Sequence, residues 1–262
     1  MAKSDVASTK TKPSISLQTT EWARANGLLA WFEAETSSTN TVAKNLTAAI
    51  LENSKPSKSP LSDLPLILFA TDSQTAGRGR GENSWSTPSG ALLSTWSFAL
   101  PFAPQPILSP LVGLALFEAA RAAFPDVAFY LKAPNDLYVG DKKIAGLLIE
   151  NVIGSASERV ICAIGLGFNA SEAPAELETA TGLASHVSAD LIRSAWPKFL
   201  AKWVEGLQAS LSSARQSELS AREQKRLLDA LNRNPKMKEP VQNVGPLGQI
   251  QFASRTLNWS DL

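Results

Sequence analysis

The chain has 262 residues, enough for one large domain or for a domain with a small appendage. Its 25 basic and 24 acidic residues give a formal net charge of +1, which argues against non-specific binding of nucleic acid as the main task. The single cysteine, Cys162, excludes an intramolecular disulfide and a multi-cysteine metal site, and the single histidine, His186, excludes a histidine cluster.

The first part of the chain predicts a tail and then the start of a folded domain. Residues 1–19 are rich in Ser, Thr and Lys, so we expect a mobile tail with little to bury and no helix-turn-helix. Periodicity and turn residues then predict a helix, a strand, a second helix and a linker, over residues 21–27, 28–33, 41–52 and 53–63. Thr39 or Asn40 stands where the cap of the second helix is expected.

The stretch of residues 72–90, DSQTAGRGRGENSWSTPSG, lies between two apolar runs and predicts a strand, a loop and a strand. Its glycines at 77, 79 and 81 alternate with Arg78 and Arg80. Glycine lets a ligand approach the main chain closely, and arginine offers a planar charged fork that suits phosphate and carboxylate. These residue types favour an anion-binding loop on a β scaffold. A solvated surface turn and an RGG-like segment that contacts RNA are the alternatives.

Downstream of this loop, the pattern predicts a hairpin among further helices and strands. The hairpin turns at Gly140-Asp141, between two β-like runs. Because side chains alternate along a strand, Lys143, Ala145, Leu147 and Ile149 are expected on one face of the returning strand. The other expected elements are a core helix over residues 106–124, a strand over 159–168, a helix over 189–211 capped by Ser188, and a helix over 217–234. With no membrane-length apolar run and no visible signal peptide, the sequence predicts a cytoplasmic protein that does not contact membranes.

Three motifs, met in the same order, resemble those of the biotin protein ligases. The first is QTAGRGR followed by Trp85 and an SxPxG run, within residues 74–93. The second is KAPNDLYVGDKKIAGLLIE, residues 132–150, and the third is GLGFN, residues 165–169. An STN triplet at residues 38–40 precedes them, and the resemblance covers about residues 31–186. Taken singly, these features have ordinary alternatives. The alternative for the STN triplet is a helix cap, that for the second motif is a turn beside a solvated lysine, and that for the third is a glycine-rich strand end.

The resemblance implies an α+β fold with a mixed β-sheet catalytic domain flanked by helices. This is the class II synthetase-like fold of the biotin and lipoate ligases, and we expect it over residues 20–234. Such ligases usually end in a small SH3-like barrel. Residues 235–262 are too few for a complete barrel and imply a reduced C-terminal SH3-like β segment. No helix-turn-helix can be fitted to the N-terminal residues, so we expect no DNA-binding domain of the kind that some of these ligases carry.

The resemblance also implies a two-step reaction with biotin and ATP as substrates and Mg2+ as the metal. In the first step the biotin carboxylate attacks the α-phosphorus of ATP, which gives biotinyl-5′-adenylate and pyrophosphate. In the second step a lysine amine of a biotin carboxyl carrier protein takes the biotinyl group. A homodimer is compatible with this family, and no nucleic-acid partner is expected.

The same resemblance implies roles for individual residues. Catalytic roles are expected for Lys143, Arg80 and Asp136, with Asp136 as the Mg2+ ligand. The residues expected to bind biotin are Ser38, Thr39, Asn40, Gln74, Arg78, Gly79, Arg80, Lys143 and Gly146. Those expected to bind ATP are Arg78, Arg80, Trp85, Lys132, Asn135 and Asn169. Trp85 is expected either to pack under the loop or to stack on adenine.

The sequence departs from the pattern of the family at two places. Residues 81–84, GENS, follow GRGR where the family often has further basic residues, and Ala133 stands where it often has tryptophan before PND. These departures predict weaker retention of the adenylate or a changed acid substrate. Two other functions are therefore kept as alternatives. One is a lipoate or octanoate ligase or transferase of the same fold, and the other is a non-catalytic relative that binds biotin or a carrier protein.

Overall fold

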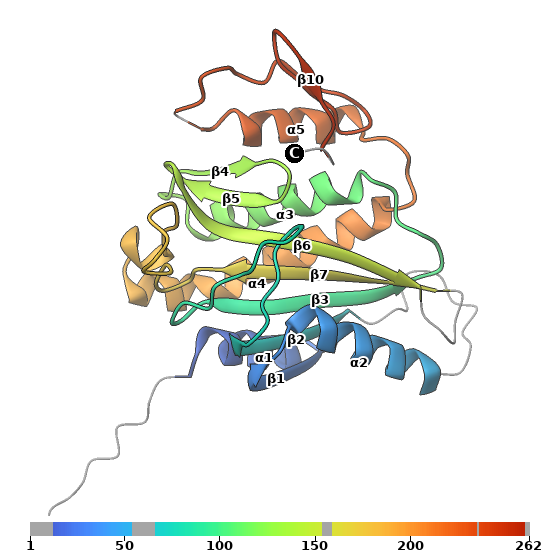
Figure 1. Cartoon of the computed structure of the whole chain (residues 1–262), viewed down its shortest axis with the longest axis vertical. Helices are drawn as coiled ribbons and strands as arrows, with labels where there is room; N and C mark the ends of the chain where they lie inside the picture. Colours follow the sequence, from blue (N-terminus) through green and yellow to red (C-terminus); the bar gives the residue numbers. More distant parts are fainter. Residues whose placement is uncertain (1–12, 54–65, 154–158, 235, 260–262) are drawn as a thin grey trace, which may run out of the picture.

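A seven-stranded mixed sheet is the frame of the protein, whose computed structural model describes residues 13–53, 66–153, 159–234 and 236–259 (Figure 1). The strand order is β1-β2-β3-β7-β6-β5-β4; β1 and β2 are parallel, and all other neighbours are antiparallel. The strands are β1 (Leu29–Thr36), β2 (Ile67–Gln74), β3 (Leu92–Leu100), β4 (Phe129–Lys132), β5 (Asp136–Val139), β6 (Lys142–Ile153) and β7 (Val160–Phe168). The predicted α+β class, a mixed sheet flanked by helices, is confirmed.

Helices cover the sheet unequally on its two faces. The helices are α1 (Ile15–Ala25), α2 (Thr39–Asn53), α3 (Leu108–Ala123), α4 (Ala189–Ser213) and α5 (Ala221–Leu231). On one face Trp196 of α4 packs on Phe168 of β7 and donates its indole N–H to Thr19 of α1 at 2.9 Å. On the other face Thr47 of α2 shares a hydrogen bond of 2.7 Å with Ser97 of β3. The loop between β2 and β3 also crosses this second face, in front of β7 and β6 (Figure 1).

The alternation of β7 gives the two faces of the sheet different surfaces. Its even-numbered residues, including Ile164, Leu166 and Phe168, belong to the hydrophobic core under α3 and α4. The odd-numbered positions on the opposite face include Gly165 and Gly167, which carry no side chain to cover the sheet. At the centre of this face, strand β7 therefore leaves room for side chains that come from α2 and the β2–β3 loop.

The start of β6 corrects one prediction. Leu137 pairs with Ala145 but Tyr138 pairs with Lys143, so Ile144 is an extra residue in the β6 ladder, a β-bulge. The expectation that Lys143, Ala145, Leu147 and Ile149 share one face is wrong. Ile144, Ala145 and Leu147 are in the core. The side chain of Lys143 instead lies beside Gly146, where an added Cβ would be 3.0 Å from Lys143 Nζ.

The first helix also begins earlier in the chain than predicted. Residues 1–12 lie outside the described part of the chain, but helix α1 begins at Ile15 and not near Glu21. Ser14 caps it by accepting from the Leu17 N–H, and Ser16 donates its buried hydroxyl to the Thr71 carbonyl at 2.7 Å. A polar composition suggested a tail, but small hydroxyl side chains can be buried when backbone carbonyls accept from them.

Most other expected elements are confirmed. Gly140, at φ 64°, turns the β5–β6 hairpin, and Ser188 caps α4 by accepting from the Leu191 N–H. Burial raises the pKa of the Cys162 thiol to about 12, as fits a structural thiol. Most of the predicted linker falls outside the described residues. No helix in the described ranges is long and apolar enough to cross a membrane.

The C-terminal segment is a small three-stranded antiparallel sheet. Its strands, β8 (Asn243–Val244), β9 (Ile250–Gln251) and β10 (Thr256–Leu257), have two residues each. Trp259 follows them, is buried, and donates its indole N–H to the Pro134 carbonyl at 2.7 Å. The predicted C-terminal β segment is thus confirmed. The division into domains at residues 20 and 235 stays a prediction.

Candidate active site

A cavity of about 580 Å³ opens on the face of the sheet that carries α2 and the β2–β3 loop. We call residues 75–91 of this connection the glycine–arginine loop. The cavity brings together nearly all the predicted site residues. Its lining includes Ser38, Thr39, Asn40, Gln74, Arg78, Gly79, Arg80, Trp85, Lys132, Asn135, Asp136, Lys143 and Gly146. Asn169 is the predicted residue that is absent from this lining; it is buried and donates to the Thr181 carbonyl at 3.1 Å.

The STN triplet lies at the N-terminal end of α2 and is buried. Because α2 begins at Thr39, the prediction that Thr39 or Asn40 caps this helix is wrong; both lie in its first turn. The Thr39 N–H donates to Gln74 Oε1 at 2.8 Å, and its hydroxyl contacts the same oxygen at 3.2 Å and Thr95 Oγ1 at 2.9 Å. Gln74 therefore satisfies an N–H that the helix leaves open, and its amide oxygen is fully used. Its Nε2 donates to no acceptor among the described residues and can serve a ligand.

Every polar atom of the Asn40 side chain has a hydrogen-bond partner. Its amide nitrogen donates to Glu150 Oε2 at 2.7 Å and to the Leu148 carbonyl at 3.3 Å, and its Oδ1 lies 2.5 Å from Thr95 Oγ1. Since two acceptors meet the nitrogen, the orientation of the amide is fixed by the network. Both amide hydrogens are spent within the protein, so a direct contact from this nitrogen to a ligand needs a change of partners.

Gly146, Gly165 and Gly167 form the base of the cavity, and we call these three residues the glycine floor. An added Cβ at Gly167 would lie 2.3 Å from Trp85 Cε2, and one at Gly146 would lie 2.9 Å from Trp85 Cζ3. The Trp85 indole therefore rests on the backbone of β6 and β7 and packs under the loop, the first of its two predicted placements. Its N–H is buried without a hydrogen-bond partner among the described residues.

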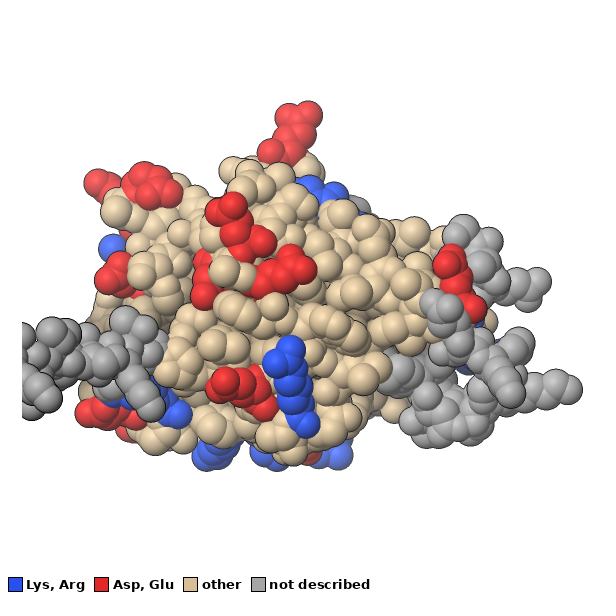
Figure 2. Space-filling view, turned by 90° about the horizontal axis from the view of Figure 1, so that it is seen from below, with Lys and Arg blue, Asp and Glu red and all other residues tan. Residues whose placement is uncertain are grey.

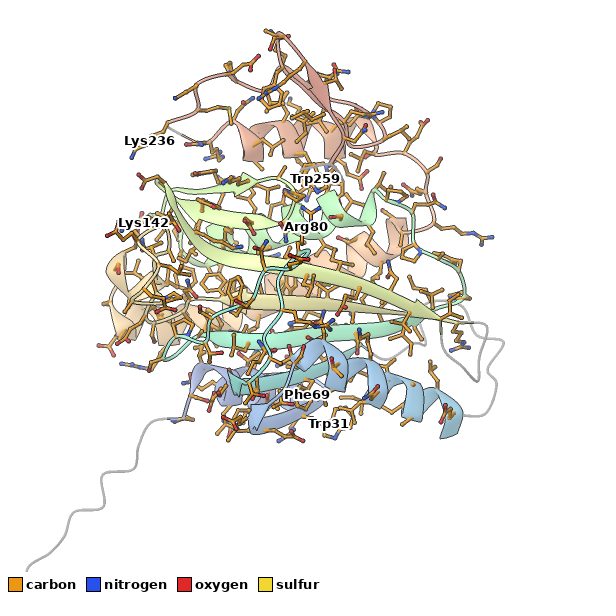
Figure 3. All side chains as sticks on the ribbon, in the orientation of Figure 1. Trp31, Phe69, Arg80, Lys142, Lys236 and Trp259 are labelled. Atoms are coloured by element: carbon orange, nitrogen blue, oxygen red, sulfur yellow. The ribbon has the colours of Figure 1, made fainter. Side chains whose placement is uncertain are left out.

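Positively charged side chains lie on two sides of the glycine floor. Lys143 Nζ lies 2.7 Å from Asp136 Oδ1 and 5.1 Å from the centre of the Trp85 ring. The side chains of this ion pair are only 31% and 18% exposed, so solvent screens it less than a surface pair. Arg78 and Arg80 line the same cavity from the glycine–arginine loop. Figure 3 shows Arg80 at the end of this loop, in front of β6.

The glycine–arginine loop folds into a small hairpin of its own. Arg78 and Ser84 form an isolated antiparallel bridge, and the Gly79 N–H donates to the Asn83 carbonyl at 2.7 Å. Gly81 turns it with φ 61°, a conformation that side chains disfavour. The side chain of Arg78, 45% exposed, reaches Glu150 Oε2 at 3.0 Å. The loop is thus exposed at its tip and joined to β6 at its base.

The predicted ATP side is formed by the β4–β5 turn. Lys132 Nζ lies 3.2 Å from the Tyr138 hydroxyl and 4.7 Å from the centre of that ring. Asn135 donates its side-chain amide to the Leu147 carbonyl, which fixes the turn against β6. Ala133 and Pro134 complete this wall, and Trp259 supports it from behind through the Pro134 carbonyl.

Charge on the neighbouring surface does not extend the positive character of the cavity. On the face seen from below, acidic side chains gather near the middle, and no continuous basic stripe crosses the residues that the structure describes (Figure 2). Strand β1 at the edge of the sheet carries exposed Glu33 and Glu35.

The arrangement can be compared with known proteins at this point. The sequence profile of the biotin/lipoate A/B protein ligase family matches residues 34–169, more than half of the chain. The chain belongs to the biotin/lipoate A/B protein ligase family. The matched range of this biotin/lipoate ligase domain includes the STN triplet, the glycine–arginine loop, the β4–β6 region and the third motif.

Relatives within the biotin/lipoate ligase family support the same assignment. The human biotin–protein ligase is 36% identical over 115 residues, which are 41% of this chain and 15% of that protein. The biotin–[acetyl-CoA-carboxylase] ligase of Paracoccus denitrificans is 35% identical over 108 residues, 38% of this chain and 43% of that protein. The match thus spans less than half of either relative. The biotin protein ligase of Aquifex aeolicus, solved with biotin and ATP, has the same fold, with a TM-score of 0.57 at 21% identity over 87% of this chain and 94% of that one.

Sequence reasoning missed three groups of residues in this biotin/lipoate ligase site. Thr95 looked like an ordinary strand residue, although it holds both Thr39 and Asn40. Glu150 ends the second motif, and that position was the available signal, but no role was attached to it. Gly165 and Gly167 were noted as a motif and not as part of the floor. Only the pairing of β7 with β6 and β3 brings them under the loop.

Proposed function

We propose that this protein activates biotin with ATP and transfers the biotinyl group to a lysine of a biotin carboxyl carrier protein. The proposal names the reaction of a biotin–[biotin carboxyl carrier protein] ligase, with Mg2+ as the metal and the cytoplasm as the setting. Membership of the family and the fold support it. The observation that carries it is the meeting of Lys143, Arg78 and Arg80 on one cavity with a neutral, buried, hydroxyl-lined end.

The charges suit the first step of this reaction. A carboxylate that approaches a triphosphate meets repulsion, and more negative charge collects on the phosphorus oxygens as they join. Fixed cations in a partly shielded site lower the free energy of that transition state more than that of the separate substrates. Lys143 is in our proposal the residue that contacts the carboxylate and the α-phosphate oxygens. Arg78 and Arg80, with the loop N–H groups, hold the phosphates.

The neutral end of the cavity, formed by Ser38, Thr39, Asn40 and Gln74, suits the ring of biotin. A ureido group presents one acceptor and two donors. The free Nε2 of Gln74 can donate to the acceptor, and the Ser38 hydroxyl can accept from one of the donors. The glycine floor keeps the main chain of β6 and β7 low at this point, and the Trp85 indole and Asn40 already lie on it. Lys132, Asn135 and Trp85 would then face the nucleotide on the remaining side. Adenine contact by Asn169 stays part of this proposal only if the ligand extends beyond the cavity lining.

Asp136 is the side chain that fits Mg2+ in this site. It is the only carboxylate in the cavity lining among the described residues, and Mg2+ commonly takes one or two carboxylates together with substrate phosphates. The metal, when bound, neutralises phosphate charge. Asp136 already holds Lys143 at 2.7 Å. A cation at this carboxylate would leave the lysine amine free for the substrates.

One incubation tests the proposal. The protein is mixed with biotin, Mg-ATP and a biotin carrier domain, and the mass of the intact carrier is measured. We expect the carrier to gain one biotinyl group, and to gain nothing when biotin or ATP is left out. Matched samples with lipoate and with octanoate address the nearest alternative. Modification by those acids alone would replace biotin as the substrate.

A non-catalytic relative would give a different pattern of results. Its motivation is the loop that lacks additional basic residues, and the retained Lys143–Asp136 pair opposes it. Calorimetry with biotin measures binding without turnover. Binding of biotin with no pyrophosphate release and no carrier modification would favour that alternative over the ligase.

A further inference from the structure

Glu150 of β6 collects three donors on one carboxylate oxygen, although it does not line the cavity. Its Oε2 accepts from Asn40 Nδ2 at 2.7 Å and lies 3.0 Å from Arg78 Nη2 and 3.3 Å from Lys44 Nζ. These donors come from α2 and from the glycine–arginine loop. One side chain therefore joins the helix at the neutral end of the cavity to the loop at its charged end.

The contact with Asn40 fixes the neutral end. With both hydrogens of its amide donated and its oxygen held by Thr95, Asn40 is 3% exposed and cannot rotate without breaking several hydrogen bonds. Ser38 and Thr39 precede it directly in the chain. The Ser38 carbonyl accepts from the Val42 N–H at 3.1 Å, so the hydrogen bonds of the first turn tie Ser38 and Thr39 to Asn40.

The contact with Arg78 fixes the base of the loop. Arg78 reaches both Glu150 Oε2 at 3.0 Å and Thr41 Oγ1 at 3.5 Å with Nη2 alone. A guanidinium has five N–H donors, so the remaining edge stays available to an anion in the cavity. An arginine held at one edge loses less freedom when a phosphate binds at the other.

The charge of Glu150 is maintained by these same neighbours. Burial alone would raise the pKa of this carboxyl, but the hydrogen bond from Asn40 and the charges of Lys44 and Arg78 outweigh burial and lower it. The side chain, 23% exposed, is therefore ionised near neutral pH. It offers a full charge to Arg78 and an acceptor to Asn40.

From this geometry we infer that Glu150 is a positioning residue. It holds the neutral end of the cavity in place through Asn40 and the glycine–arginine loop in place through Arg78, without touching either substrate. The inference rests on the proposed function for the identity of the two ligands. It assigns two separable tasks to one side chain. The acceptor oxygen serves Asn40, and the negative charge serves Arg78.

Two substitutions separate these tasks. Glu150→Gln keeps an oxygen that can accept from Asn40 but removes the charge, whereas Glu150→Ala removes both. Calorimetry gives the Kd of biotin and of a non-hydrolysable ATP analogue for each variant. We expect Glu150→Gln to change the biotin Kd less than about twofold and to weaken the analogue at least about fivefold, and Glu150→Ala to weaken both at least about fivefold.

A matched control removes an ion pair of comparable exposure elsewhere. Glu118 of α3 pairs with Arg226 of α5, with side-chain exposures of 38% and 41%. Glu118→Gln should leave both dissociation constants within about twofold of the wild-type values. An effect of Glu150→Gln no larger than that of Glu118→Gln, or an equal loss for both ligands, would overturn the inference. If Glu150→Ala does not fold, Glu150→Gln alone still decides.

A second comparison tests the route through Arg78. In an Arg78→Ala background, Glu150→Gln should weaken the ATP analogue by less than about twofold more, because the partner of the charge is already gone. Additive losses would contradict that route. Because these measurements are of binding, they remain informative if turnover is absent. A wild-type protein that binds neither ligand would defeat the proposed function itself, before Glu150 is considered.

Discussion

The two sides of the cavity are built in opposite ways. At the neutral end, Thr39, Asn40 and Thr95 are buried to 5% exposure or less, and their polar atoms are paired with one another and with Gln74. The glycine–arginine loop is exposed at its tip and touches the sheet chiefly through Trp85 and the Arg78–Glu150 pair. In the proposed reaction, the ring of the acid would therefore enter a preformed place, while the charged groups would come from a loop that is exposed at its tip.

The largest effect is expected where both sides meet, at Lys143. Lys143→Ala removes the cation nearest the joining anions and should raise the barrier of the first step by about 3–4 kcal/mol, or about 10²–10³ in rate, by analogy with the loss of one charged or oriented donor elsewhere. Biotin-dependent exchange between ATP and pyrophosphate measures it. The neighbouring Lys142 is exposed, and Lys142→Ala is the matched control with normal exchange. Near-normal exchange for Lys143→Ala would remove this lysine from the mechanism.

A substitution in the glycine floor should weaken ligand binding at the neutral end of the cavity more than at the charged end. At Gly165 an added Cβ would lie 2.6 Å from Asn40 Oδ1, an atom that the network holds in place. Gly165→Ala should therefore destabilise the fold by about 1–3 kcal/mol and weaken biotin more than ATP. Gly113→Ala in α3 is the control, since its Cβ would meet Leu131 at an ordinary 3.4 Å. Thermal unfolding and calorimetry give both quantities; equal losses for biotin and ATP would argue against two independent sides.

Added positive charge in the glycine–arginine loop should affect the charged side of the cavity and not the neutral end. Residues 81–84 hold no cation, and Glu82 is exposed near the loop tip. Asn83→Arg or Glu82→Lys should lengthen the lifetime of the bound adenylate severalfold and leave the biotin Kd unchanged. Because exposed charges are screened, the gain should shrink between low salt and about 1 M salt, where the Debye length is about 3 Å. A wild-type adenylate as long-lived as that of the variants would show that the loop departures are without effect.

The smallest effect is expected in acid, at the carboxylate that joins the two sides. The pKa of Glu150 is lowered from its ordinary 4.5, so its stabilising contribution is present above pH 4.5 and is lost as the pH falls below that value. Glu150→Gln should lower the Tm at pH 7 by about 2–4 °C if the network contributes about 1 kcal/mol, and by less near pH 4. Melting curves across this range test it. A constant difference between wild type and variant would rule out titration of Glu150 as the cause.

The sequence predicted the residues that line this site better than the residues that hold them in place. Apolar runs and turn residues were sufficient for most strands and helices, and the motifs brought Lys143 and the two arginines to one place. Local patterns could not show the extra residue at Ile144, which turns Lys143 toward Gly146, because a bulge is defined by the pairing of two strands. Glu150 and Thr95 were missed for the same reason, since their partners lie 55 to 110 residues away along the chain.

The C-terminal segment and Asn169 show other limits of sequence reasoning. Nothing in residues 235–262 announces that Trp259 supports the turn at Pro134, because that contact joins positions 125 residues apart. The role of Asn169 was taken from the third motif alone. Its side chain is buried outside the cavity lining, so contact with adenine stays a prediction.

The glycine floor also limits how the choice of acid can change. Gly146, Gly165 and Gly167 already present the smallest surface that an amino acid allows, so no substitution there can make room for a thicker ring. An added Cβ would meet Trp85 at Gly146 and Gly167 and Asn40 at Gly165, so any replacement pushes on these side chains before it reaches a ligand. Room for a bulkier acid in the proposed reaction would therefore have to come from Trp85 and the glycine–arginine loop that carries it.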